Sequence, residues 1–231
     1  MRESILTIPV NEIFEKKCGC PVCAMRDELE QHAVEYIMGA AMMEPDVRIE
    51  TNKSGFCKEH FEQMRACKNR LSLALMLQTH LQELQKTVFT EKGFFESKDS
   101  KSRKTTERIS KVVNDCFVCA KIEWGFTRWL TNMFDLYKRE REFRELFSQQ
   151  QFICLPHYKA LMQKCDSDMD KSVKNEFREV CTKLVKNYLD ELEKDVSHYC
   201  KMYDYRNTGK DADWGNSKDS IERAIKFLTT R

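Results

Sequence analysis

Apolar residues recur every three or four positions along most of the chain, which is the spacing of helices with one buried face. This pattern predicts helices over residues 22–43, 58–88, 117–137 and 170–203, with shorter helical segments near 7–14, 45–54, 140–148 and 221–228. One face of the segment 170–203 carries Val173, Phe177, Val180, Cys181, Leu184, Tyr188 and Leu192. We therefore expect an all-α bundle with a long helix near its C-terminus.

The composition supports an all-α fold. Only seven glycines and four prolines occur in 231 residues, whereas β-sandwiches and α/β folds normally need more turn residues. With 41% hydrophobic residues, the chain can bury a core and is too apolar to be disordered. We expect Trp124 and Trp129 to lie in that core, and Trp214 to fold the last helix back onto the bundle.

A pattern of cysteine and histidine occurs twice. Cys20 and Cys23 are followed after 33 residues by Cys57 and His60, and the same C-x2-C…C-x2-H order recurs with 34 intervening residues. The second set consists of Cys116, Cys119, Cys154 and His157. Its C-x2-C pair lies 96 positions after that of the first set, and its C-x2-H pair lies 97 positions after. The preserved spacing indicates an internally duplicated fold, with one repeat in residues 1–91, a polar linker in 92–106 and a second repeat in 107–231.

Three cysteines and one histidine are a common ligand set for structural zinc, which prefers four tetrahedral nitrogen and sulfur donors. We expect each repeat to close its own site: Cys20, Cys23, Cys57 and His60 in the first, and Cys116, Cys119, Cys154 and His157 in the second. Each ion, two in all, would join two helix starts. An iron–sulfur cluster is an alternative, since histidine can replace cysteine, and buried thiols without a ligand are another.

The remaining residues favour a non-enzymatic protein, because no nucleophile–base arrangement or phosphate-binding loop is found and a closed site has no open position for water. His32, His80 and His198 are expected to be structural. Polar segments 44–52 and 204–216 could line a pocket, but a Glu44–Arg48 ion pair is the simpler interpretation. The cysteines outside the repeat are expected to pack or lie exposed, with Cys18 a possible exchanging ligand or redox thiol: Cys18, Cys67, Cys165, Cys181 and Cys200.

The net charge of +2 gives little attraction for nucleic acid or an anionic membrane. A local basic excess in 92–108 keeps a nucleic-acid-binding zinc module as an alternative. No apolar run approaches the ~20 residues of a membrane span, and residues 1–6 lack the apolar stretch of a signal peptide. Eleven cysteines in a protein without an export signal are expected to be thiols or metal ligands in the cytoplasm.

Four segments of the chain are typical of one family. Residues 7–11 (TIPVN), 44–57, 69–80 (NRLSLALMLQTH) and 204–218 resemble a family of uncharacterised bacterial proteins, a domain of unknown function met mostly in anaerobic Gram-positive bacteria. The resemblance covers nearly the whole chain, including all eight positions of the two Cys/His sets. It implies a bacterial cytoplasmic protein and supplies no activity or catalytic residue.

Together these features predict a zinc-binding structural or interaction protein, with a protein or a small molecule as its partner. An iron–sulfur or thiol redox protein is the main alternative, motivated by the surplus cysteines.

Overall fold

The computed structural model describes residues 6–88, 98–204 and 213–230. These residues form α-helices joined by short loops and contain no strand, which confirms the predicted all-α class. No helix among them is both long and apolar enough to cross a membrane. The helices are α1 (Ile8–Glu15), α2 (Pro21–Met38), the 3₁₀ helix η1 (Ala40–Met43), α3 (Pro45–Ser54), α4 (Lys58–Ala66), α5 (Arg70–Thr87), α6 (Lys98–Asn114), α7 (Phe117–Arg139), α8 (Arg141–Ser148), α9 (Leu155–Asp168), α10 (Lys171–Met202) and α11 (Ser220–Thr229).

The chain divides into two compact units. Unit 1 comprises Met1–Arg26 with Arg128–Arg231, and unit 2 comprises Asp27–Thr127. The chain passes from unit 1 to unit 2 within α2 and returns within α7. The units therefore do not coincide with the predicted halves 1–91 and 107–231, because each long helix contributes its two ends to different units.

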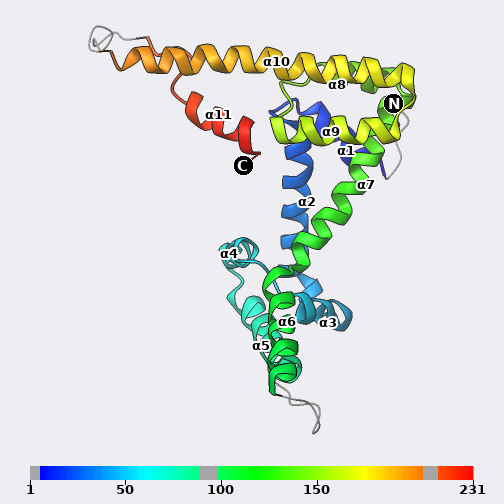
Figure 1. Cartoon of the computed structure of the whole chain (residues 1–231), viewed down its shortest axis with the longest axis vertical. Helices are drawn as coiled ribbons and strands as arrows, with labels where there is room; N and C mark the ends of the chain where they lie inside the picture. Colours follow the sequence, from blue (N-terminus) through cyan, green and yellow to red (C-terminus); the bar gives the residue numbers. More distant parts are fainter. Residues whose placement is uncertain (1–5, 89–97, 205–212, 231) are drawn as a thin grey trace. The chain divides into compact units, whose positions relative to one another are not determined.

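Unit 1 is built around α10, which packs against α8, α9 and α11 (Figure 1). Its core is aromatic. The Phe177 ring of α10 lies 4.9 Å from Tyr137, 5.1 Å from Phe134 and 5.3 Å from Phe147, measured between ring centroids. Phe177 is fully buried, as its place on the apolar face of the predicted long helix requires.

The last helix is held against α10 by aromatic contacts. Phe227 of α11 is fully buried and lies beside Phe152 and Tyr188, whose rings stack 3.9 Å apart. Trp214 packs edge-on against Tyr199 and Tyr203 at the end of α10, so the C-terminal segment folds back as expected. Residues 205–212 of the predicted segment 204–216 lie outside the described residues.

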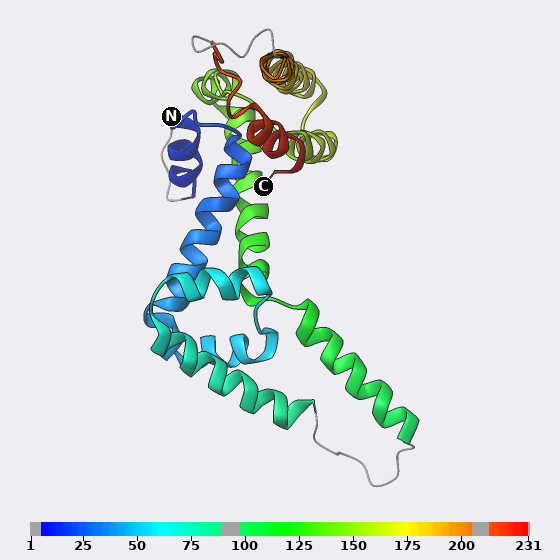
Figure 2. The same cartoon turned by 90° about the vertical axis from the view of Figure 1, so that its left-hand side faces the viewer.

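Unit 2 packs α3 along α5 (Figure 2). The Arg48 guanidinium joins the two helices by donating to the Leu75 carbonyl and to Thr79 Oγ1, each at 2.7 Å. The predicted Glu44–Arg48 ion pair is therefore not the contact that holds this arginine. The reason is that one backbone carbonyl and one hydroxyl of α5 lie within reach of its planar donors.

Two further predictions about unit 2 are corrected. The proposed linker 92–106 is helical from residue 98 onward, and its residues 92–97 lie outside the described part. The Ser- and Lys-rich composition hid this helix, α6, in which Arg103 pairs with Glu107 one turn later. The single helix expected over 58–88 is interrupted at Lys68, whose φ of 61° is left-handed, and Asn69 caps the start of α5.

Trp124 is also not a core residue. It lies on α7 with 63% of its surface exposed, whereas Trp129 is half-buried. Helical periodicity places a residue on a face of its helix but does not tell whether another element covers that face.

Replacing Phe177 with alanine is expected to destabilise the protein by about 3–5 kcal/mol, because the cavity left among three aromatic rings cannot collapse completely. The measurement is the free energy of unfolding in urea. Leu189→Ala on the same helix is the matched control, since Leu189 is 45% exposed and its loss should change stability by less than about 0.5 kcal/mol. Equal losses for the two variants would contradict the proposed core.

Candidate metal centres

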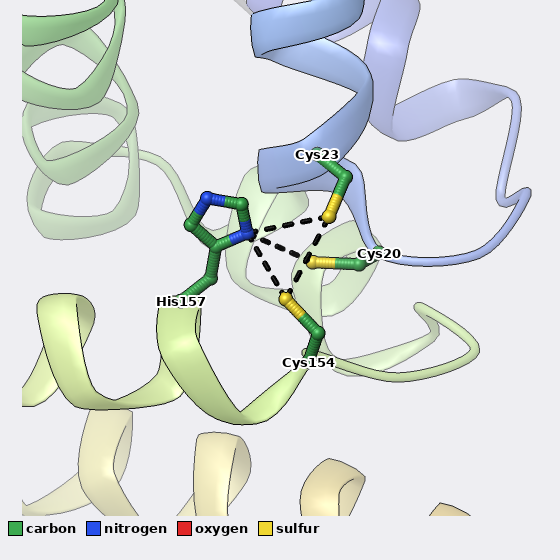
Figure 3. Close-up of side chains that lie close together, drawn as sticks. All are labelled: Cys20, Cys23, Cys154 and His157. Atoms are coloured by element: carbon green, nitrogen blue, oxygen red, sulfur yellow. Dashed lines mark hydrogen bonds between the residues drawn. The ribbon is translucent and has the colours of Figure 1, made fainter. Parts of the chain in front are cut away.

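Four of the eight predicted ligands meet in unit 1, in a group that we call site 1. Cys20 and Cys23 come from the start of α2, and Cys154 and His157 come from the start of α9. Figure 3 shows the three sulfur atoms and the Nδ1 atom of His157 converging on one point. All four side chains are buried, with exposed fractions between 0% and 8%.

The spacing of the donor atoms in site 1 matches a single four-coordinate ion. Cys23 Sγ lies 3.6 Å from Cys154 Sγ, and His157 Nδ1 lies 3.0, 3.3 and 3.8 Å from Cys154, Cys23 and Cys20 Sγ. With Zn–S bonds of about 2.3 Å and Zn–N bonds of about 2.0 Å, the edges of a regular tetrahedron are roughly 3.5–3.8 Å. The measured separations are within about 0.5 Å of these edges, so the four donors can hold one metal ion.

The other four ligands form site 2 in unit 2. Cys57 and His60 stand at the start of α4, and Cys116 and Cys119 at the start of α7. His60 Nδ1 lies 3.1, 3.3 and 3.4 Å from the Sγ atoms of Cys57, Cys116 and Cys119. Cys57 Sγ and Cys119 Sγ are 3.9 Å apart. These donor distances also fit one tetrahedral ion.

The predicted pairing of the ligands is wrong, although the eight residues do gather in two sets of four. Each C-x2-C pair meets the C-x2-H pair of the other repeat, so Cys20 and Cys23 join Cys154 and His157 rather than Cys57 and His60. The 18 residues of α2 make a helix about 27 Å long. The helices that follow, α3 and α4, stay in unit 2, whereas Cys23 at the start of α2 belongs to unit 1, so the chain does not bring Cys57 and His60 back to Cys23.

Every ligand pair sits at a helix N-terminus. The carbonyl groups of Cys20, Cys57, Cys116 and Cys154 accept the first backbone hydrogen bonds of α2, α4, α7 and α9. Two helix starts therefore point at each site, and their unpaired amide groups and positive dipole ends favour thiolate. In site 2 one such amide, that of Cys119, donates to Cys116 Sγ at 3.5 Å.

Without an ion, the sulfur atoms oppose one another's ionisation. Burial raises the pKa of Cys116, but hydrogen bonds from His60 and neighbouring groups outweigh it and lower the value to about 6. Burial and the nearby Cys116 thiolate raise the pKa of Cys119 to about 12. In site 1 hydrogen bonding with Cys20 raises the pKa of Cys154 to about 12. A cation among the sulfurs would remove this conflict, since ligand cysteines bind as thiolates.

Glu30 supports site 2 from α2 and was not found by sequence reasoning. Its Oε1 accepts a hydrogen bond from His60 Nε2 at 3.0 Å, and the two side chains are 15% and 3% exposed. This contact places the ring proton on Nε2 and leaves the lone pair of Nδ1 for a metal ion, as carboxylates do for metal-bound histidines. Glu30 lies within the charged run Asp27-Glu28-Leu29-Glu30, in which no sequence signal distinguishes it.

The other histidines and cysteines lie outside both sites. His80 Nδ1 lies 2.9 Å from the Asn52 carbonyl oxygen, and His198 Nε2 lies 2.9 Å from that of Asp213. His32 pairs with Glu28 one turn away on α2. Among the cysteines, Cys165 and Cys181 are buried, and three are exposed: Cys18, Cys67 and Cys200.

The fold and the two centres define a class: an all-helical protein with two groups of three cysteines and one histidine, able to hold metal ions. A family model described as "Family of unknown function (DUF6062)" matches residues 1–231. The chain therefore belongs to this family, in agreement with the resemblance seen in the sequence. No curated protein and no solved structure matches the chain.

Paired substitutions test the crossed arrangement. If Cys20 and Cys154 belong to one site, the C20S/C154S variant should retain about one ion per chain, whereas C20S/C57S should lose both, since each site then lacks a ligand. Metal content is measured by elemental analysis after gel filtration. If each site were formed within one Cys/His set, C20S/C57S would retain about one ion and C20S/C154S would lose both. The two double variants therefore decide between the arrangements.

Replacing Glu30 with alanine should weaken metal binding at site 2 by roughly 10–100-fold, because His60 loses the partner that orients it and raises its basicity. Competition with a chromophoric chelator measures the affinity. Glu35→Ala, at an exposed position of the same helix, is the matched control. If both variants bind both ions like the wild type, Glu30 has no supporting role.

Proposed function

We propose that this chain is a zinc-binding structural protein, with one zinc ion in each site, and that it acts as a scaffold or binding module rather than as an enzyme. The observation that carries the proposal is the closed set of four converging donors in each unit. A structural zinc site has four protein ligands, whereas a catalytic site keeps a position for water or substrate. Three sulfurs and one nitrogen already fill a tetrahedron.

The donor spacing supports zinc over an iron–sulfur cluster. All donor atoms of a site lie within 4.8 Å of one another. A cluster places several irons and bridging sulfides between its cysteine ligands, so it holds those ligands farther apart than a single ion does. Zinc also needs no redox partner and accepts the tetrahedral geometry without distortion.

The ions would act by joining distant parts of the chain. The ligands of site 1 that face each other are 131–137 positions apart, and those of site 2 are 56–62 apart. Cross-links that close long loops remove much conformational freedom from the unfolded chain. Two such links would stabilise the bundle in addition to its buried apolar core.

A cleft of about 340 Å³ in unit 2 supports a binding role. Its walls come from the end of α3 and the first turns of α7, and its lining residues are Glu50, Lys53, Ser54, Phe117, Ala120, Lys121 and Trp124. Lys121 lies 5.3 Å above the Phe117 ring, and Trp124 is largely exposed. Exposed tryptophan beside charged residues is typical of binding hot spots, so we place the protein or small-molecule partner here.

We also propose a cytoplasmic location. All eleven cysteines are free in the structure, including the six whose sulfur atoms lie close together in the two sites. Thiolate ligands persist where the surroundings are reducing. A reducing compartment therefore suits both the metal ligands and the exposed thiols.

The zinc proposal predicts about two zinc ions per chain in colourless protein purified without air. Removing them with a strong chelator should unfold or loosen the helices, because metal binding and folding are coupled in such sites. Elemental analysis gives the metal content, and circular dichroism follows the helices during chelation. A brown protein that contains iron and absorbs visible light would overturn the proposal.

A further inference from the structure

The two metal centres differ in how far solvent reaches their sulfur atoms. In site 1 the most exposed sulfur ligand, Cys23, has 6% of its surface accessible. In site 2 Cys57 is half-buried and Cys119 is exposed, while Cys116 and His60 are buried, with 8% and 2% of their surfaces accessible. The accessible side of site 2 is therefore formed by two sulfurs, one from α4 and one from α7.

The burial of site 1 has a structural cause in the C-terminal segment. The end of α11 lies over the site, with the Thr230 carbonyl oxygen 3.9 Å from Cys23 Sγ. Phe227 holds α11 in place beside Phe152, a residue two positions before Cys154. In site 2, by contrast, the Cys119 side is exposed to solvent and the Cys57 side is half-buried.

We propose that Cys57 and Cys119 form an oxidation site for peroxides, at which oxidation releases the ion of site 2 and leaves site 1 loaded. The inference rests on the proposed occupation of both sites by zinc. Oxidation of cysteine follows thiolate character and exposure. Cysteines that bind zinc are thiolates, and among the six ligand cysteines Cys119 is the one exposed to solvent.

The chemistry needs only hydrogen peroxide as the oxidant. The Cys119 thiolate attacks one peroxide oxygen, the O–O bond breaks, and the products are a sulfenic acid at Cys119 and hydroxide. The Cys57 thiolate, whose sulfur lies 3.9 Å from that of Cys119, then attacks the oxidised sulfur. A disulfide forms, a second hydroxide leaves, and two protons from solvent convert both hydroxides to water.

The disulfide removes two of the four ligands at once, so the ion leaves site 2. His60 keeps its contact with Glu30, and the new bond still joins α4 to α7. Oxidation would therefore exchange one cross-link for another within unit 2. Reduction by a dithiol would regenerate both thiolates and allow the ion to bind again.

The test uses the full-length, zinc-loaded protein treated with hydrogen peroxide. Zinc release is followed with a metallochromic dye, and disulfides are mapped by mass spectrometry of a digest prepared without reductant. We expect one of the two ions to leave roughly tenfold faster than the other, given the dependence of oxidation on exposure. We also expect the early disulfide to link Cys57 with Cys119.

A matched control removes the exposed cysteines that are not ligands, in the variant C18S/C67S/C200S. Fast release should persist in this variant; its disappearance would assign the chemistry to another thiol. Release of both ions at the same rate, no release, or an early disulfide between Cys116 and Cys119 instead would each overturn the proposal. A starting content other than two zinc ions would instead overturn the proposed function.

Discussion

The crossing of ligands between the two Cys/His sets is the constraint on which the rest of the structure depends. Each centre takes two sulfurs from one set and a sulfur and an imidazole from the other. The requirement that four donors meet within a few ångströms therefore fixes pairs of helix starts that are far apart in sequence. The connecting helices α2 and α7 then leave one unit and enter the other, which explains why both ends of the chain contribute to unit 1 and its middle forms unit 2.

The two loops that the centres close are nested, and this suggests an order of assembly. The sulfurs facing each other are 62 positions apart in site 2 and 131 apart in site 1. Each doubling of loop length adds about 0.6 kcal/mol to the entropy of closure, so site 2 is the easier one to close first. Once Cys57 and Cys119 are held together, the path from Cys23 to Cys154 becomes much shorter, and site 1 closes at lower entropic cost.

Much of this could be predicted from residue types and spacing. Helical periodicity and scarce glycine and proline gave the fold class, and the repeated spacing selected all eight residues of the two centres. The pairing could not be predicted, because ligand spacing does not reveal which distant partner a C-x2-C turn meets. Helix α6 was missed since its residues 98–108 contain no apolar side chain, and Glu30 since its role depends on a contact with His60 30 positions away.

The crossed ligands have a consequence for the origin of the chain. Neither of the two C-x2-C…C-x2-H sets contains all the donors of either centre, since each set supplies one half of both. If the two repeats descend from a single ancestral segment, a lone copy of that segment would have had no closed centre of this kind. Two copies associated as a symmetric dimer would have had two, each completed by exchange between the subunits. Fusion of the genes would then have turned an intermolecular bond into an intramolecular one.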